Sequence, residues 1–330
     1  MAKKKTAKKK TAKKKVAKKK VAKKSTVKKK IVKKKGSSDK ELFYSLLELI
    51  RVSSTVLPDD VNNAIIKSLE DEEKQTSAEY ALDIIRKNIE MAKNKSQPLC
   101  QDTGTIIFKV KHPVGLSQIK FRKITEDAVV VATKKGYLRQ NSVDSLTGTN
   151  DTLNIGPGHP AIYFHEHAKD TVEVCLMLKG GGSENVSSQY ALPYTPLEAG
   201  RDLNGVRKVI LDSIVKAQGK GCGPGILGVC IGGDRGSGHA TAKEQFLRKM
   251  DDTNEIEALA ALEEDIVETA NKLGIGPMGF GGKTTLLGCK VGVLNRLPAS
   301  FYVSISYMCW AFRRQGVSLK KDYSINKWLY

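Results

Sequence analysis

A single change of sequence pattern near residue 38 separates a segment that cannot build a hydrophobic core from one that can. Residues 1–35 repeat a short unit of alanine, lysines and threonine or valine, and they hold 20 of the 56 basic residues and no acidic residue. Like charges at every spacing repel, and this segment has little apolar surface to bury. The other 36 basic residues nearly balance 35 acidic ones. We therefore expect a disordered tail over residues 1–37 and a near-neutral folded domain over residues 38–330.

The tail accounts for the net charge of +21 and leaves two interpretations open. It can bind nucleic acid or another polyanion by releasing counterions, or it can be a solvated extension without a role in the chemistry. No stretch approaches the roughly 20 apolar residues that span a bilayer, and no apolar segment of a signal peptide follows the lysines. We expect no membrane partner and a cytoplasmic location, where cysteines are free thiols or metal ligands.

The apolar pattern of the domain predicts both helices and strands. Residues at helical spacing predict helices over residues 42–50, 61–69, 77–93, 119–135, 198–217 and 255–273. Short apolar runs predict strands over residues 105–110, 161–164, 172–178, 226–231, 286–293 and 301–307. Because the two kinds of element do not alternate regularly, the pattern favours an α+β fold over a doubly wound one.

Three glycine-dense segments lie at residues 179–185, 219–225 and 274–283. Glycine allows backbone N–H groups to approach a ligand closely and to form a nest for an anion. One such segment is usually a turn, whereas three in one domain indicate that anionic groups are held. None has the spacing of a nucleotide phosphate-binding loop, so a nucleotide site is not expected.

The six cysteines form two groups. Three lie inside apolar strand-like runs, where cysteine behaves as a small hydrophobic residue: Cys175, Cys230 and Cys289. Three lie beside polar or glycine residues at loops or strand ends: Cys100, Cys222 and Cys309. The spacings of 122 and 87 residues in the second group carry no local signature, so the pattern alone leaves metal ligation open. A structural zinc site would need a fourth protein ligand, whereas an iron–sulfur cubane held by three cysteines keeps one iron open.

Five segments resemble motifs of the class I, iron–sulfur-dependent fumarate hydratases and of the related L-tartrate dehydratase α subunits. These segments are residues 98–105, 139–156, 179–185, 222–235 and 307–314. The first, fourth and fifth are similar to the three cluster-ligand motifs, the second to a substrate-arginine segment and the third to a glycine-rich substrate loop. The resemblance spans about residues 40–330 and excludes the lysine tail.

The resemblance implies an oxygen-sensitive [4Fe–4S] cluster held by Cys100, Cys222 and Cys309. The fourth iron would act as a Lewis acid on a substrate carboxylate and on the hydroxyl that is lost or gained. Coordination to iron makes hydroxide a better leaving group. The implied enzyme is a hydro-lyase that interconverts fumarate and (S)-malate.

The resemblance also implies a set of substrate-binding residues around the cluster. Gln101 and Asp102 would contact the dicarboxylate, and Arg139 would clamp one carboxylate, in the bidentate geometry that guanidinium favours. The backbone of Gly181 and Gly182 would close over the substrate. Asp102 and Arg139 are the candidate catalytic residues.

Two departures from the family pattern restrict this interpretation. Single-chain members continue into a second domain, so we expect a separate β subunit to supply further active-site residues and this chain alone to be nearly inactive. Some members place a histidine shortly before the third cysteine, where this sequence has residues 295–297, Asn-Arg-Leu. L-tartrate dehydration is the alternative within the family. A polyanion-binding protein and a zinc-stabilised scaffold are alternatives from other classes.

Overall fold

A computed structural model describes residues 38–330; the predicted lysine tail lies outside the described residues. Its α-helices are α1 (Ser38–Thr55), α2 (Asp59–Asp71), α3 (Ser77–Lys95), α4 (Gln118–Lys134), α5 (Gly181–Asn185), α6 (Leu203–Ala217), α7 (Arg235–Glu244) and α8 (Glu257–Lys272). Its strands are β1 (Thr105–His112), β2 (Ala161–Glu166), β3 (Val172–Lys179), β4 (Ser188–Ala191), β5 (Gly225–Ile231), β6 (Leu286–Val293), β7 (Tyr302–Met308), β8 (Arg313–Leu319) and β9 (Ile325–Trp328). The predicted α+β class is confirmed. No helix within residues 38–330 has both the length and the apolar character needed to cross a membrane.

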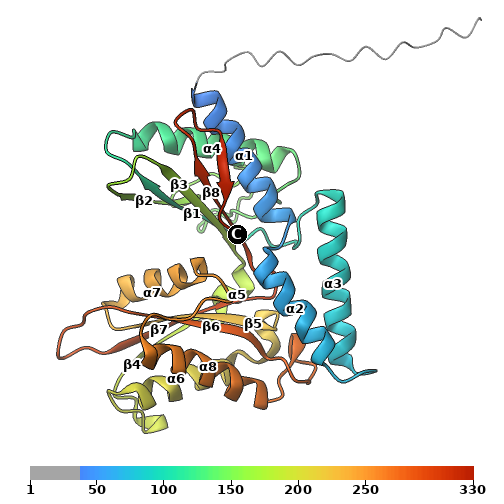
Figure 1. Cartoon of the computed structure of the whole chain (residues 1–330), viewed down its shortest axis with the longest axis vertical. Coiled ribbons are helices and arrows are strands. Elements are labelled where there is room, and N and C mark those ends of the chain that lie inside the picture. Colours follow the sequence, from blue (N-terminus) through green and yellow to red (C-terminus); the bar gives the residue numbers. More distant parts are fainter. Residues whose placement is uncertain (1–37) are drawn as a thin grey trace, which may run out of the picture. The chain divides into compact units, whose positions relative to one another are not determined.

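The strands form two mixed sheets (Figure 1). In the first sheet the order is β2-β1-β3-β8-β9, with β1 and β2 parallel and the other pairs antiparallel. In the second sheet the order is β4-β7-β5-β6, with β5 and β6 parallel and the other pairs antiparallel. The nearly uninterrupted burial of β5 and β8 shows that both are interior strands covered on two faces.

Amphipathic helices cover the sheets and close the cores. Helices α1 and α4 pack on the first sheet, where Leu46, Val129 and Leu176 are fully buried in one cluster. Helices α6 and α8 cover one face of the second sheet, and α7 covers the other (Figure 1). This burial of apolar side chains is the main stabilising term of each layer.

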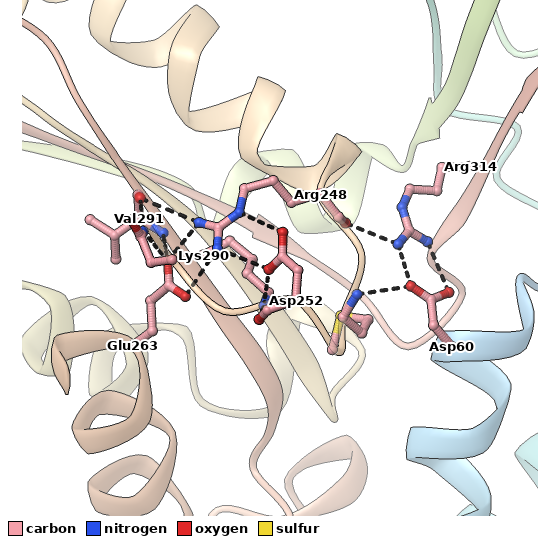
Figure 2. A network of polar contacts seen from close by, with 9 residues as sticks. Asp60, Arg248, Asp252, Glu263, Lys290, Val291 and Arg314 are labelled. Atoms are coloured by element: carbon pink, nitrogen blue, oxygen red, sulfur yellow. Dashed lines mark hydrogen bonds and ion pairs between the residues drawn. The ribbon is translucent and has the colours of Figure 1, made fainter. Parts of the chain in front are cut away.

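A polar network joins α2 to strands and loops of both sheets (Figure 2). Asp60 of α2 accepts from Arg314 of β8 at 2.6 Å, and Arg314 also donates to the carbonyl of Arg248 at 3.0 Å. Arg248 pairs with Asp252 at 2.9 Å and with Glu263 of α8 at 2.7 Å. The network therefore connects α2 to β8, to the loop of Arg248 and Asp252, and to α8.

The predicted start of one helix differs from the structure, and some elements were not predicted. Helix α6 begins at Leu203 and not near residue 198, because Asp202 caps it by accepting from the N–H of Gly205 at 2.7 Å. The pattern missed α7 because its buried positions are small residues and not large apolar ones. That helix lies so close to β5 that a Cβ at Gly228 would be 2.2 Å from the carbonyl oxygen of Ala242. Strands β4, β8 and β9 were also missed; β8 contains two arginines.

Candidate functional site

The two crossings of the chain between the sheets bring four segments to one place. The chain leaves the first sheet after β3 and returns to it after β7. Thr105 at the start of β1 pairs with Lys179 at the end of β3, and the end of β3 also pairs with the start of β8. In the second sheet, Ile226 near the start of β5 pairs with Met308 at the end of β7. Four segments therefore meet here: those before β1, after β3, before β5 and between β7 and β8.

This convergence brings the three candidate ligands Cys100, Cys222 and Cys309 together. Burial raises the pKa of the Cys309 thiol to about 11, the guanidinium of Arg313 opposes this rise, and Cys100 and Cys222 add to it. Burial also raises the pKa of Cys222, with further contributions from Cys100 and Asp102. The thiols influence one another because they lie in one site although they are far apart in the sequence.

The three cysteine thiols provide the donor type that an iron–sulfur cluster takes. Among residues 38–330 no group of three or more His, Cys, Asp or Glu side chains is arranged to hold one metal ion. Cysteines that hold a cubane each bind a different iron, so their sulfurs need not converge on one point. The N–H of Trp310 donates to the carbonyl of Cys222 at 3.2 Å and joins the loop of the second cysteine to the segment of the third. Three cysteine thiols fit the donor set of a [4Fe–4S] cluster with one open iron.

Asp102 is held by hydrogen bonds from three neighbouring segments. Its Oδ1 accepts from the N–H of Gly104 at 2.8 Å and from Nδ2 of Asn141 at 3.1 Å. Its Oδ2 accepts from the N–H of Gly181 at 2.7 Å. Nη1 of Arg313 donates to the backbone carbonyl of Asp102 at 2.7 Å. The carboxylate is therefore oriented between the Cys100 turn and the glycine-rich segment, and the N–H of Gly181 is already engaged.

Gly104 allows the Cys100 turn to lie directly against the end of β3. Its φ is +73°, and a Cβ at this position would be 2.3 Å from the carbonyl oxygen of Lys179. Only glycine combines that backbone conformation with so close an approach. The turn that carries Cys100 and Asp102 is thereby placed beside Gly181 and Gly182, both of which are exposed.

The glycine-rich segment is a short helix, α5, and not only a loop. Lys179 precedes it and is 0% exposed, with Nζ 2.7 Å from the carbonyl of Tyr307 and 2.8 Å from Oε2 of Glu184. Burial lowers the pKa of Lys179, and Glu184 opposes this. Glu184 also pairs with Lys243 of α7. These contacts fix α5 against β7 and α7.

Arg139 presents an exposed side chain from an anchored backbone. Thr103 Oγ1 donates to the carbonyl of Arg139 and accepts from its N–H, both at 2.8 Å. The buried Asn154 donates to the same carbonyl at 2.9 Å, and its Oδ1 accepts from the N–H of Asn141 at 2.8 Å. The guanidinium of Arg139 makes no hydrogen bond to any side chain or carbonyl of residues 38–330. It is therefore available to a ligand.

Gln101 is exposed at the edge of a groove of about 800 Å³ that also includes Cys100. The groove runs along α3 and is walled by aromatic and apolar side chains, among them Phe280 and Trp310. Gln101 thus lies in an accessible groove beside Cys100.

Sequence reasoning missed several residues that organise this site. Asn141 and Asn154 lie inside the predicted substrate segment, but nothing in their spacing shows which backbone groups they bind. Lys179 belongs to the predicted loop, although its burial could not be foreseen. Arg313 follows Cys309 by four residues, and the sequence pattern assigns it no role. His159 has a structural contact in this region: its Nδ1 lies 2.8 Å from the carbonyl of Asn154.

Comparison with known proteins defines the class to which this fold and site belong. A family model described as Fumarate hydratase (Fumerase) matches residues 44–318. The chain therefore belongs to the fumarate hydratase family, a family of hydro-lyases.

Individual relatives add detail about which members the chain resembles. A protein of Geobacillus stearothermophilus, provisionally named fumarate hydratase class I, is 52% identical over 296 residues, which are 88% of this chain but 57% of that relative. A Methanocaldococcus jannaschii protein, provisionally named L(+)-tartrate dehydratase subunit alpha, is 34% identical over 84% of this chain and 97% of that relative. The L(+)-tartrate dehydratase subunit alpha of Escherichia coli K12 is 30% identical over 82% of this chain and 88% of that relative. The chain thus spans just over half of the first relative and most of the other two.

Proposed function

We propose that this chain is the cluster-holding part of a class I fumarate hydratase that adds water reversibly to fumarate to give (S)-malate. The observation that supports this best is the meeting of Cys100, Cys222 and Cys309 beside the oriented carboxylate of Asp102. A [4Fe–4S] cluster held by these thiolates would supply a Lewis acid that makes hydroxide a better leaving group.

The other predicted residues would bind and orient the dicarboxylate. The exposed guanidinium of Arg139 has the geometry to take a carboxylate through two parallel N–H groups. Gln101 and Asp102 lie next to Cys100, where they would contact the substrate close to the reacting carbon atoms. The backbone of Gly181 and Gly182 would close over the substrate: Gly182 would contact it through its backbone, and Gly181, whose N–H is bonded to Asp102, would leave room for it because it has no side chain.

We also propose a separate β subunit that completes the active site. This chain matches proteins named α subunits over most of their length, and it matches just over half of the Geobacillus relative. A second polypeptide would supply the general base and further cations for the second carboxylate. On this proposal the isolated chain, in the reducing cytoplasm, has little turnover.

The test is anaerobic co-purification with any bound partner, followed by measurement of iron, sulfide and fumarate formation from malate. Serine variants of Cys100, Cys222 and Cys309 should each lose iron and activity. Cys175→Ser is the matched control, because this cysteine lies within β3 and has no expected role in the cluster. If any one of the three variants keeps wild-type iron content and rate, the proposal fails.

The second candidate is the dehydration of L-tartrate to oxaloacetate. Its support is the match to two tartrate dehydratase α subunits over 97% and 88% of their length. Both reactions need the same cluster and differ in one substrate hydroxyl. Initial rates with malate and with L-tartrate on one loaded preparation distinguish them, and a higher kcat/KM for L-tartrate would replace the first proposal with the second.

A further inference from the structure

Two consecutive arginines begin β8, and both are buried, with Arg313 at 1% and Arg314 at 0% exposure. Because successive side chains of a strand point to opposite faces, the two guanidinium groups enter different surroundings. Arg314 pairs with Asp60 (Figure 2) and lies between the rings of Phe312 and Tyr330, each 4.4 Å from its guanidinium carbon. Its charge is neutralised within the protein.

Arg313 has no such compensation. Nη1 donates to the carbonyl of Asp102 at 2.7 Å, but Nε and Nη2 are buried without a hydrogen-bond partner. No carboxylate of residues 38–330 forms an ion pair with it, whereas Arg314 has Asp60. A buried cation without an anion is strongly unfavourable, so an anion other than the carboxylates of residues 38–330 is needed to balance it.

The position of Arg313 indicates which anion that is. The residue ends the short segment that begins at Cys309, and its hydrogen bond reaches the turn that carries Cys100. Its Nη2 is 3.8 Å from the place that a Cβ would take at Gly180, and Oδ2 of Asp102 is 3.1 Å from the same place, so the guanidinium lies beside the glycine-rich segment and the Cys100 turn. A substrate carboxylate would approach from the exposed side, where Arg139 lies. The anionic groups on the side of Cys309 would be the thiolates and the cluster that they would hold.

We propose that Arg313 is a positioning residue that balances the negative charge of the thiolate-bound cluster and fixes the Cys100 turn relative to Cys309. This inference rests on the proposed cluster. Net charge and nearby hydrogen-bond donors set the reduction potential of an iron–sulfur cluster. Arg313 therefore makes the cluster easier to reduce and slows its loss from the protein.

The test compares Arg313→Met and Arg313→Lys with Arg314→Met, each in the full chain with any co-purified partner. The midpoint potential is measured by anaerobic spectroelectrochemical titration, and cluster retention by iron release to a chelator. Arg313→Met should shift the potential to more negative values and weaken cluster retention roughly 10- to 100-fold. Arg313→Lys keeps the charge, so its midpoint potential should lie close to the wild-type value. Arg314→Met should have the same midpoint potential as the wild type.

Thermal unfolding of the metal-free variants separates this role from a structural one. Without the cluster, Arg313→Met removes an uncompensated charge and should lower Tm far less than Arg314→Met, which breaks an ion pair. An unchanged potential in Arg313→Met, a Lys variant with the potential of the Met variant, or an equal loss of Tm at the two positions would overturn the inference. A wild-type protein without iron and sulfide would instead refute the proposed function.

Discussion

Replacement of Asp60 by asparagine should destabilise the fold, because it leaves the buried guanidinium of Arg314 without an anion (Figure 2). The two carboxylate oxygens accept from Arg314 at 3.3 and 2.6 Å, and Oδ2 also accepts from the N–H of Met250 at 2.9 Å. The side chain of Arg314 is 0% exposed and that of Asp60 is 12% exposed. Asparagine keeps the shape and one acceptor oxygen, so the substitution mainly removes the charge.

The expected loss follows from the burial of the pair. Removing one partner of a buried ion pair costs about 3–5 kcal/mol. We expect about 3 kcal/mol, since asparagine still accepts one hydrogen bond and Asp60 is not fully buried. For a domain of about 290 residues the loss corresponds to a decrease in Tm of roughly 5 °C. Combining Asp60→Asn with Arg314→Met removes both charges and should recover part of the loss.

Thermal unfolding of the metal-free protein at several pH values tests this account. Burial acts to raise the pKa of Asp60, but the hydrogen bond and charge of Arg314, with backbone N–H groups, hold it below its usual value. A depressed carboxyl pKa gives stability that is complete above the unfolded-state pKa and is lost as pH falls through the folded one. The difference in Tm between wild type and Asp60→Asn should therefore be full at neutral pH and shrink in acid. A pH-independent difference, or a double variant as unstable as the sum of the single variants, would refute the reasoning.

Three further predictions concern the site and the tail. Gly104→Ala should reduce the iron content per chain, because its Cβ would be 2.3 Å from the carbonyl oxygen of Lys179. Gly136→Ala is the control that should keep its iron, because Gly136 has a similar φ of +75° but no atom within 4 Å of the added Cβ. Arg139→Gln should raise KM for malate roughly 10- to 100-fold through loss of a charged hydrogen bond, with unchanged iron content; an unchanged KM would remove Arg139 from the site. Deletion of residues 2–35 should leave turnover unchanged at fixed partner concentration and should abolish any salt-sensitive binding to polyanions. A loss of turnover would assign the tail a catalytic role.

The predicted elements agree with the structure where a local pattern carries the signal. Helices α1 to α4 and α8 and strands β1 to β3 and β5 to β7 match the predicted ranges to within a few residues, because each has an amphipathic or continuous apolar pattern. The pattern failed at α7, where small residues permit close packing, and at β8, where polar side chains are buried. In both cases the tertiary environment supplies the partners that make the burial possible.

The candidate site was only partly predictable for a related reason. Motif resemblance named Cys100, Asp102 and Arg139, yet it gave no account of why residues so distant in the chain should meet. The pairing of strand ends at the two crossings supplies that account.

Residue order alone specified a lysine-rich segment beside a near-neutral domain, the α+β class and the residue types available for a cluster and a dicarboxylate. These properties follow from composition and from short-range periodicity, which do not depend on the tertiary fold. The meeting of the thiols, the orientation of Asp102 and the isolation of the Arg313 charge depend on strand register and on burial. Register and burial arise only when distant segments pack, because a contact between residues 211 positions apart, such as that of Arg313 with Asp102, has no local signal.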